Sequence, residues 1–377
     1  MKRETMFVLT VTLALTLVGI LMVYSSSGVG TRAAERLREP SPLYYVNRQL
    51  AYMAIGLLGM WIASRIDYHR WATPLYFRGI VFVSLALLVL VLMIGAKTGG
   101  ACRWIPVAGF RFQPSEFAKF AVILLLAVKL SQNQQHIRSF WRGIAPPAVT
   151  TCVFLGLIVA EHDLGVPVVI GSVCLLMLLM AGIPKRYFFL ALGCGGAGVA
   201  GLIYLSPNRM ERILAFRNPW ADPSDTGLQL IQSLAAFAQG GILGRGPGAS
   251  EKKLHYLPAA HTDFIFAVWG EEMGLVGCLA LVVLFVALLI ASMRIVAGAR
   301  DSFGALLAGG IVSLVSFQAA FNMAVTIGLL PTKGLPLPFI SSGGTALIVY
   351  LSMIGVLLNI GLQAEDPERA GDFVPTT

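Results

Sequence analysis

The segment Phe264 to Met293 reads FIFAVWGEEMGLVGCLALVVLFVALLIASM and decides the class of fold. Its only charged residues are Glu271 and Glu272. An apolar run of about 20 residues is long enough to cross a bilayer as an α-helix, because each residue adds about 1.5 Å along the helix axis. The segment therefore predicts a transmembrane helix.

Apolar runs of spanning length recur along almost the whole chain. With 56% hydrophobic residues, 12% charged residues and a mean hydropathy of +0.77, the composition lies well outside the range of soluble domains. The sequence predicts an all-α integral membrane protein, a bundle of about ten transmembrane helices forming a single domain over residues 1–377. The predicted spans are 6–24, 49–64, 77–95, 115–131, 144–161, 163–181, 187–205, 264–293, 304–328 and 341–363.

An even number of spans places both termini on one side of the membrane. The first run follows a basic start that resembles a signal peptide, but no small-residue cleavage site lies close behind it, so we interpret it as a retained helix. The positive-inside rule favours cytoplasmic termini and a short cytoplasmic tail at about 364–377. The basic residues that then face the cytoplasm are Arg65, Arg70, Arg138, Arg142, Lys185, Arg186, Arg294 and Arg300.

The loops predicted on the other side are also basic, which opposes the positive-inside rule. The large extracytoplasmic loop, at about 206–262, joins the seventh and eighth spans, and the polar stretches 96–115 and 331–344 lie on the same side. Positive charge retained on the translocated side indicates an anionic ligand. The net charge of +9 points to membrane phosphates, because the chain has no motif for nucleic-acid binding.

Asp263 stands where the long apolar helix begins, with aromatic residues directly behind it. Partial desolvation raises the pKa of such a carboxyl and a helix N-terminus lowers it, so the group can be ionised and still accept a proton from a hydroxyl. An ordinary N-cap aspartate is the alternative. Both interpretations stay open on this residue alone.

Arg209 and Arg212 are three residues apart, so on a helix they would share a face and could hold a diphosphate. A basic loop lying against anionic headgroups is an equally good account. Five cysteines show no C-x-x-C spacing, which argues against metal or disulfide roles.

Lys119 lies one turn inside the span that begins near Pro114 and Glu116. An ammonium group at that depth needs a partner, and Asp163 is predicted at a comparable level, so we expect a Lys119–Asp163 ion pair with either a structural or a catalytic role. Glu271 and Glu272 lie about two turns below Asp263. They are candidates for function or for interhelical hydrogen bonds, and no step is assigned to them.

Two further segments are irregular. Gly240 to Gly248 is rich in glycine but lacks the G-K-[ST] ending of a phosphate-binding loop, so a flexible external turn is expected. The prolines of Pro336 to Ser341 prevent a helix until Ser341, which predicts either a backbone that lines a wet cavity or a tight re-entrant connection. Small residues at Gly193, Ala197 and Gly201 predict close packing of two helices.

Taken together, these segments resemble the SEDS family (shape, elongation, division and sporulation), whose members include FtsW, RodA and SpoVE. The matching residues are Arg103-Trp104, Gln113-Pro114-Ser115-Glu116 with Lys119, Asp163-Leu164-Gly165, Asn218 to Pro223, Gln229 with Gln232-Ser233, His261 to Ala267 with Glu271-Glu272, and Pro336 to Ser341. The resemblance implies an inverting peptidoglycan glycosyltransferase that links lipid II disaccharides into glycan strands, with Asp263 as the essential carboxylate. It also implies a set of substrate-binding residues, Arg103, Trp104, Glu116, Lys119, Asp163, Arg209, Arg212, Gln229, Lys252 and Ser341.

Lys252-Lys253-Leu254 and Leu330 to Gly334 are more similar to the division-type members than to the elongation-type (RodA-like) members, which remain an alternative. The resemblance then implies a multi-pass protein of the cytoplasmic (inner) membrane at the division septum. Its expected partners are lipid II, a class B penicillin-binding protein transpeptidase and other divisome membrane proteins, and a divalent cation (Mg or Mn) is a possible cofactor. His162 departs from the family, which usually has proline before the Asp-Leu-Gly.

Two rival functions share these features. A transporter that flips lipid II would also need a basic outer site, but it should have a polar path through the bundle, and charge within the spans is sparse, chiefly Lys119, Lys129, Glu271 and Glu272. A scaffold that only positions other proteins would leave the concentrated outer charge unexplained.

Overall fold

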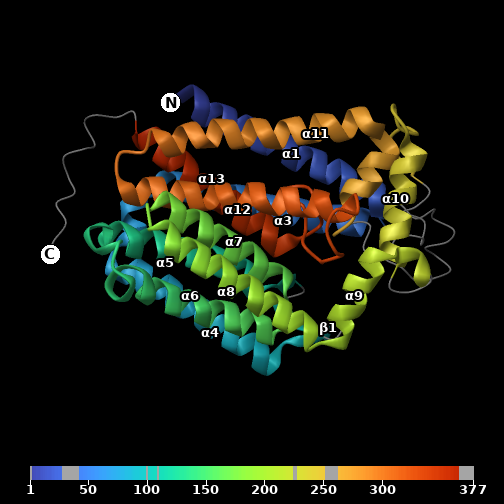
Figure 1. Cartoon of the computed structure of the whole chain (residues 1–377). Coiled ribbons are helices and arrows are strands. Elements are labelled where there is room, and N and C mark those ends of the chain that lie inside the picture. The colour runs from blue at the N-terminus through green and yellow to red at the C-terminus, as the bar shows by residue number, and fades with distance from the viewer. Residues whose placement is uncertain are drawn as a thin grey trace.

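The computed structural model describes residues 2–27, 42–98, 101–107, 110–223, 227–250 and 262–364. They form a bundle of long helices (Figure 1). Each predicted span falls on one helix: α1 (Lys2–Ser27), α3 (Pro42–Arg65), α4 (Pro74–Ile94), α5 (Pro114–Gln132), α6 (Ala145–Ala160), α7 (Gly165–Met180), α8 (Lys185–Tyr204), α11 (Ile265–Ala297), α12 (Ser302–Thr326) and α13 (Gly344–Gln363).

Among the described residues, seven helical segments are long and apolar enough to cross a membrane. They are Lys2–Ser26, Pro74–Ile94, Phe140–Ala160, Lys185–Tyr204, Ile265–Ala297, Ser302–Thr326 and Gly344–Gln363. The chain is therefore a multi-pass membrane protein, and crossing by α3, α5 and α7 stays a prediction.

The helix boundaries follow local chemistry. Pro74 and Pro114 begin α4 and α5, where the missing amide hydrogen costs no intrahelical bond. Asp301 caps α12, because its carboxylate accepts a hydrogen bond from the Gly304 amide at 3.2 Å.

The centre of the bundle is formed by α5, α12 and α13, which are buried along most of their length. Helix α8 lies at the periphery and, among the described residues, has none that is buried. The predicted close packing through Gly193 and Gly201 is wrong here, since a Cβ added at either position would meet nothing within 4 Å. The small residues of α8 line an open face instead.

The two ends of the bundle differ (Figure 1). The start of α1 and the end of α13 lie together, because Gly361 packs against Thr5. At the opposite end lie helices α9 (Pro207–Arg217) and α10 (Leu228–Gly240), which form within the stretch predicted as a large loop. Short helical turns complete the chain at Tyr68–Ala72, Gln134–His136, Phe140–Ile144 and Pro219–Ala221.

A small antiparallel sheet interrupts the all-α pattern in the polar stretch between α4 and α5. Its strands are β1 (Ala96–Thr98), β2 (Ala101–Val107) and β3 (Phe110–Phe112), in the order β1-β2-β3. Trp104 is opposite Ala96, and Ile105 is opposite Phe112. Hydropathy did not predict this sheet, because its strands are too short to show an alternating pattern. The sheet fixes the position of Arg103.

Candidate active site

A polar cavity of about 150 Å³ lies between segments that are far apart in the sequence. Its walls come from β2, the turn between α6 and α7, the junction of α8 and α9, and the connection that precedes α13. The lining residues are Arg103, His162, Asp163, Leu164, Ser206, Asn208, Arg209, Arg212, Lys333 and Gly334. Of the predicted site residues, Arg103, Asp163, Arg209 and Arg212 therefore come together in one cavity.

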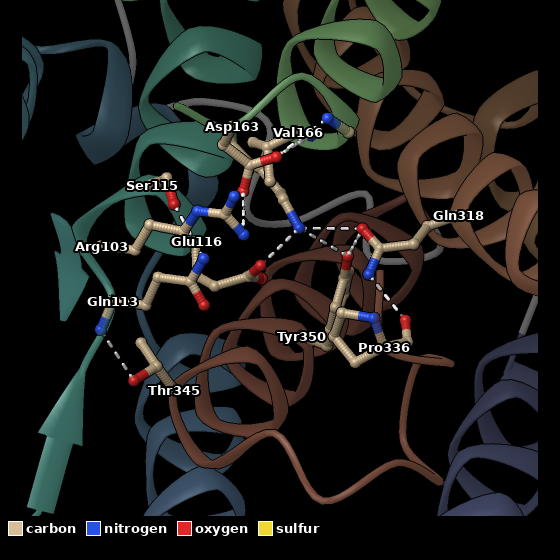
Figure 2. A network of polar contacts seen from close by, with 12 residues as sticks. Arg103, Gln113, Ser115, Glu116, Asp163, Val166, Gln318, Pro336, Thr345 and Tyr350 are labelled. Atoms are coloured by element: carbon tan, nitrogen blue, oxygen red, sulfur yellow. Dashed lines mark hydrogen bonds and ion pairs between the residues drawn. The ribbon is translucent and has the colours of Figure 1, made fainter. Parts of the chain in front are cut away.

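Arg103 is held against the α6–α7 turn. Its Nη2 donates a hydrogen bond to the His162 carbonyl oxygen at 3.0 Å, and its Nη1 lies 3.5 Å from Oδ2 of Asp163. Figure 2 shows the Arg103 and Asp163 side chains pointing toward one another. The buried Nε of Arg103 has no hydrogen-bond partner among the described residues. Both terminal nitrogens of Arg103 are therefore engaged with the α6–α7 turn.

Asp163 is fixed by the helix that it begins. Its Oδ1 accepts the amide hydrogen of Gly165 at 2.9 Å, as helix-capping aspartates do. The preceding residue, His162, has a φ of 65°. Proline cannot adopt this conformation, because its ring holds φ near about −65°. The family usually has proline at this position, and proline could not adopt the backbone conformation that His162 has here.

Glu161 is a buried acid next to this turn that sequence reasoning missed. It is 0% exposed, and neither carboxyl oxygen has a hydrogen-bond partner among the described residues. Burial and the nearby Asp163 charge together raise the pKa of Glu161 to about 8, and Arg103 opposes the rise. This shift favours the protonated form of Glu161 near neutral pH.

Arg209 and Arg212 lie on α9, and both line the cavity, which confirms that they share a helical face. Nη1 of Arg209 donates a hydrogen bond to the Leu202 carbonyl oxygen at 3.1 Å, which ties α9 back to α8.

Asp263 is partly buried just before α11 and is not itself among the residues that line the cavity. It lies against the lining residue Gly334. A Cβ added to Gly334 would stand 3.0 Å from Oδ2 of Asp263, so the carboxylate lies in close contact with the Gly334 backbone. The N-cap of α11 is Phe264, and no side chain caps the helix, so the alternative of an ordinary capping aspartate is wrong. Burial raises the pKa of Asp263 to about 7, the Asp163 charge adds to the rise, and Arg103 and Arg212 oppose it.

The connection between α12 and α13 carries Lys333 and Gly334 into the cavity. Asn322 of α12 holds it in place, with Nδ2 donating to the carbonyl oxygens of Asp263 at 2.8 Å and Leu335 at 2.7 Å. Burial lowers the pKa of Lys333 to about 8, and the Arg212 charge contributes. This connection lines the cavity through Lys333 and Gly334, and Pro336 to Ser341 are not among the lining residues. Lys333 was missed as a site residue, although a lone lysine between Pro331 and Gly334 was a visible signal.

The predicted Lys119–Asp163 ion pair is wrong. Nζ of Lys119 lies 2.7 Å from Oε1 of Glu116, three residues earlier on α5, and it also donates to Oε1 of Gln318 at 2.8 Å. Tyr350 completes this network, and Gln318 connects it to the Pro336 carbonyl oxygen at 2.8 Å (Figure 2). Asp163 is paired with Arg103 instead. Lys119 and Glu116 are buried behind the cavity and do not line it.

The remaining predicted residues have different positions. Ser341 supports the backbone beside Asp263, since its Oγ donates to the Thr262 carbonyl oxygen at 2.6 Å and accepts from the Leu337 amide at 2.7 Å. Trp104 on β2 and Gln229 on α10 are partly buried and outside the cavity lining. Lys252 lies outside the described residues. In the described part of the chain, no group of three or more His, Cys, Asp or Glu residues could hold a metal ion.

Comparisons with known proteins give the family. A family model described as "Cell cycle protein", which covers FtsW, RodA and SpoVE, matches residues 5–366. The chain is 44% identical over 361 residues to the "Probable peptidoglycan glycosyltransferase FtsW" of Geobacter sp. (strain M18), an alignment that covers 94% of this chain and 96% of that one. It is 39% identical over 352 residues to the "Stage V sporulation protein E" of Bacillus subtilis (strain 168), with 93% and 94% covered.

A solved structure described as "Structural coordination of polymerization and crosslinking by a peptidoglycan synthase complex" superposes with a TM-score of 0.78 at 26% identity. The alignment covers 95% of this chain and 97% of that one. With the cavity, its basic lining and the adjacent carboxylate in the matched region, the chain belongs to the FtsW, RodA and SpoVE family of cell cycle proteins.

Proposed function

We propose that this chain is a peptidoglycan glycosyltransferase that polymerises lipid II at the outer face of the cytoplasmic membrane. The FtsW relatives carry the name of this activity. One observation of this molecule carries the proposal: the Asp263 carboxylate lies against Gly334, which lines a cavity together with Arg103, Arg209, Arg212 and Lys333.

In the proposed reaction, Asp263 removes the proton from the 4-hydroxyl of the acceptor sugar. The hydroxyl oxygen forms a bond to the anomeric carbon of the donor with inversion, and the bond from that carbon to the diphosphate oxygen breaks. Undecaprenyl diphosphate leaves with the bonding electron pair. A carboxylate with a pKa of about 7 suits this task, because general bases work best with a pKa near the operating pH.

The cavity is suited to the leaving group. Four cationic side chains, Arg103, Arg209, Arg212 and Lys333, outnumber the carboxylates Asp163 and Asp263. Fixed positive charges at a developing oxyanion lower the barrier because they need no reorganisation during the reaction. A divalent cation (Mg or Mn), if used, would enter with the diphosphate, which supplies oxygen ligands that the described acids do not provide as a cluster.

The partner and location follow from relatives. A chain of a peptidoglycan synthase complex that couples polymerisation to crosslinking has this fold, so we propose a class B penicillin-binding protein transpeptidase as the partner here. The FtsW relatives favour a division role, with other divisome membrane proteins at the septum and with both termini in the cytoplasm. An elongation role is the alternative.

The test is an assay of glycan-strand formation from lipid II by purified protein in detergent, where there are no two sides for a transporter to connect. Asp263→Ala should abolish strand formation. Asp301→Asn serves as the matched control and should keep strand formation. Asp301 is the acid at the start of α12, and Asp263 lies near Asn322 toward the end of the same helix. If Asp263→Ala forms strands at the wild-type rate, the catalytic assignment of Asp263 is refuted. If the wild-type protein forms no strands even with its transpeptidase, the proposed glycosyltransferase activity is refuted.

A further inference from the structure

Helix α11, which begins at Ile265, is broken about two and a half turns after its start, at Gly274. The residue has φ 65° and ψ −166°, which is outside the helical region and accessible almost only to glycine. An unbroken helix would have bonds from the amides of Leu275 and Val276 to the carbonyls four residues earlier, those of Glu271 and Glu272. The break removes both bonds.

The segment Gly240–Gly248, here called the strap, replaces them. The Leu275 amide donates to the Gly241 carbonyl oxygen at 2.9 Å, and the Val276 amide donates to the Ile242 carbonyl oxygen at 3.2 Å. The freed carbonyl oxygens of Glu271 and Glu272 accept the amides of Arg245 and Gly246, both at 3.0 Å. The strap is therefore inserted into the helix ladder, and the expectation of a flexible external turn is wrong.

Glycine makes this approach possible. A Cβ at Gly244 would overlap the Glu272 carbonyl, and a Cβ at Gly240 would overlap the Gly270 carbonyl oxygen. On the other side of the contact, a Cβ at Gly274 would overlap the Gly244 backbone nitrogen. The glycine-rich composition that resembles a phosphate loop thus serves backbone-to-backbone contact.

The two intramembrane acids reinforce the same contact with their side chains. Oε2 of Glu271 accepts a hydrogen bond from Ser250 Oγ at 2.5 Å, and Oε1 lies 3.6 Å from Nη1 of Arg245. Oε1 of Glu272 accepts a hydrogen bond from Ser25 Oγ of α1 at 2.5 Å. Both glutamates are buried, so breaking these contacts would leave polar groups without partners.

We infer that the strap, Glu271 and Glu272 position the first segment of α11, and with it Asp263, and that the two glutamates are positioning residues for glycosyl transfer. This inference rests on the proposed role of Asp263. The segment from Ile265 to Met273 is a rigid arm of about 14 Å, so an error at the break moves its far end. A misplacement of about 1 Å in a reacting group can cost about a hundredfold in rate.

The test compares Gly274→Ala with Gly171→Ala, a glycine inside α7 where an added Cβ meets nothing within 4 Å. Both variants are purified in detergent with lipid II as the substrate. Gly274→Ala should lower kcat at least about tenfold while KM changes less than about twofold, because the cavity cations lie on other elements. Amides of residues 264–273 should exchange hydrogen faster, and Gly171→Ala should match the wild type in both measurements.

A folded Gly274→Ala protein with wild-type kcat, or with wild-type exchange over 264–273, would overturn the inference. If that variant does not fold, Glu271→Gln decides by the same criteria, since it keeps an acceptor for Ser250 and loses the charge that faces Arg245. Hydrogen exchange does not depend on the reaction, so it separates this inference from the proposed function. The proposed function fails if Asp263→Ala remains active or if the wild-type protein with its transpeptidase forms no strands.

Discussion

Two clusters of acidic and basic side chains lie near one another in this molecule, and they differ in how completely their charges are paired. In the network around Lys119, the ammonium has Glu116, Gln318 and Tyr350 as partners within hydrogen-bonding distance. In the cavity, cations outnumber carboxylates among the lining residues. Residue types alone do not separate a structural staple from a binding site. The ratio of cations to acidic partners separates the two, because an excess of one charge is stable only where water or an anion can reach it.

The largest effect is expected from breaking the buried ion pair between Lys119 and Glu116. Lys119→Met would leave the Glu116 carboxylate buried without its cation, a change that costs about 3 to 5 kcal/mol. The apparent Tm in detergent should fall by the largest amount of any variant here. The double variant Lys119→Met with Glu116→Gln removes both charges and should recover much of the loss. If Lys119→Met alone is as stable as the double variant, the Lys119–Glu116 ion pair does not stabilise the fold.

A cavity cation should behave in the opposite way. Arg212→Ala removes a charge-assisted contact to the diphosphate of about 1.5 to 3 kcal/mol, so kcat/KM should fall about tenfold to a hundredfold. The apparent Tm should stay within about 1 °C, because the Arg212 charge serves the ligand. Glu211→Gln, an exposed neighbour on α9, is the control and should leave kcat/KM unchanged. If Arg212→Ala lowers the apparent Tm and leaves turnover unchanged, Arg212 has a structural role and does not bind the substrate.

The pH dependence of turnover sharpens the contrast further. With the pKa of Asp263 at about 7, the ionised fraction of this base rises about tenfold from pH 6 to pH 8, and kcat should rise with it. Above pH 8, Lys333 loses its proton and KM for lipid II should increase. Lys333→Arg should abolish that increase, since arginine stays charged. A kcat that is constant from pH 6 to pH 8 would exclude Asp263 as the base.

The smallest expected effect is a gain in stability. The folded protein holds the Asp263 proton more tightly than the unfolded chain, since the pKa rises from 3.8 to about 7 on folding. The contribution of this group to stability therefore falls as pH rises through that window. Asp263→Asn should raise the apparent Tm by about 2 °C at pH 8 and leave it unchanged at pH 4 or below. An equal or lower Tm at pH 8 would contradict the burial of this carboxylate.

Much of the site could be predicted because its signals are local. Asp263 at a helix start and the helical spacing of Arg209 and Arg212 are visible in a few consecutive residues. The error over Lys119 was avoidable in part, since Glu116 stands three residues earlier, at a spacing that places two side chains on one helix face. A comparable depth in the membrane favoured Asp163 as the partner of Lys119, although Glu116 is much nearer in the sequence.

The sequence by itself determined where the helices form, because a run of apolar residues of spanning length has few other stable states in a bilayer. It also determined which residues could carry charge to the outer end. Only the tertiary structure decided that Gly334 meets Asp263, that β2 delivers Arg103 to Asp163, and that the strap enters the break in α11. These are contacts between segments far apart in the chain, and they depend on partner geometry that no local pattern of residues contains.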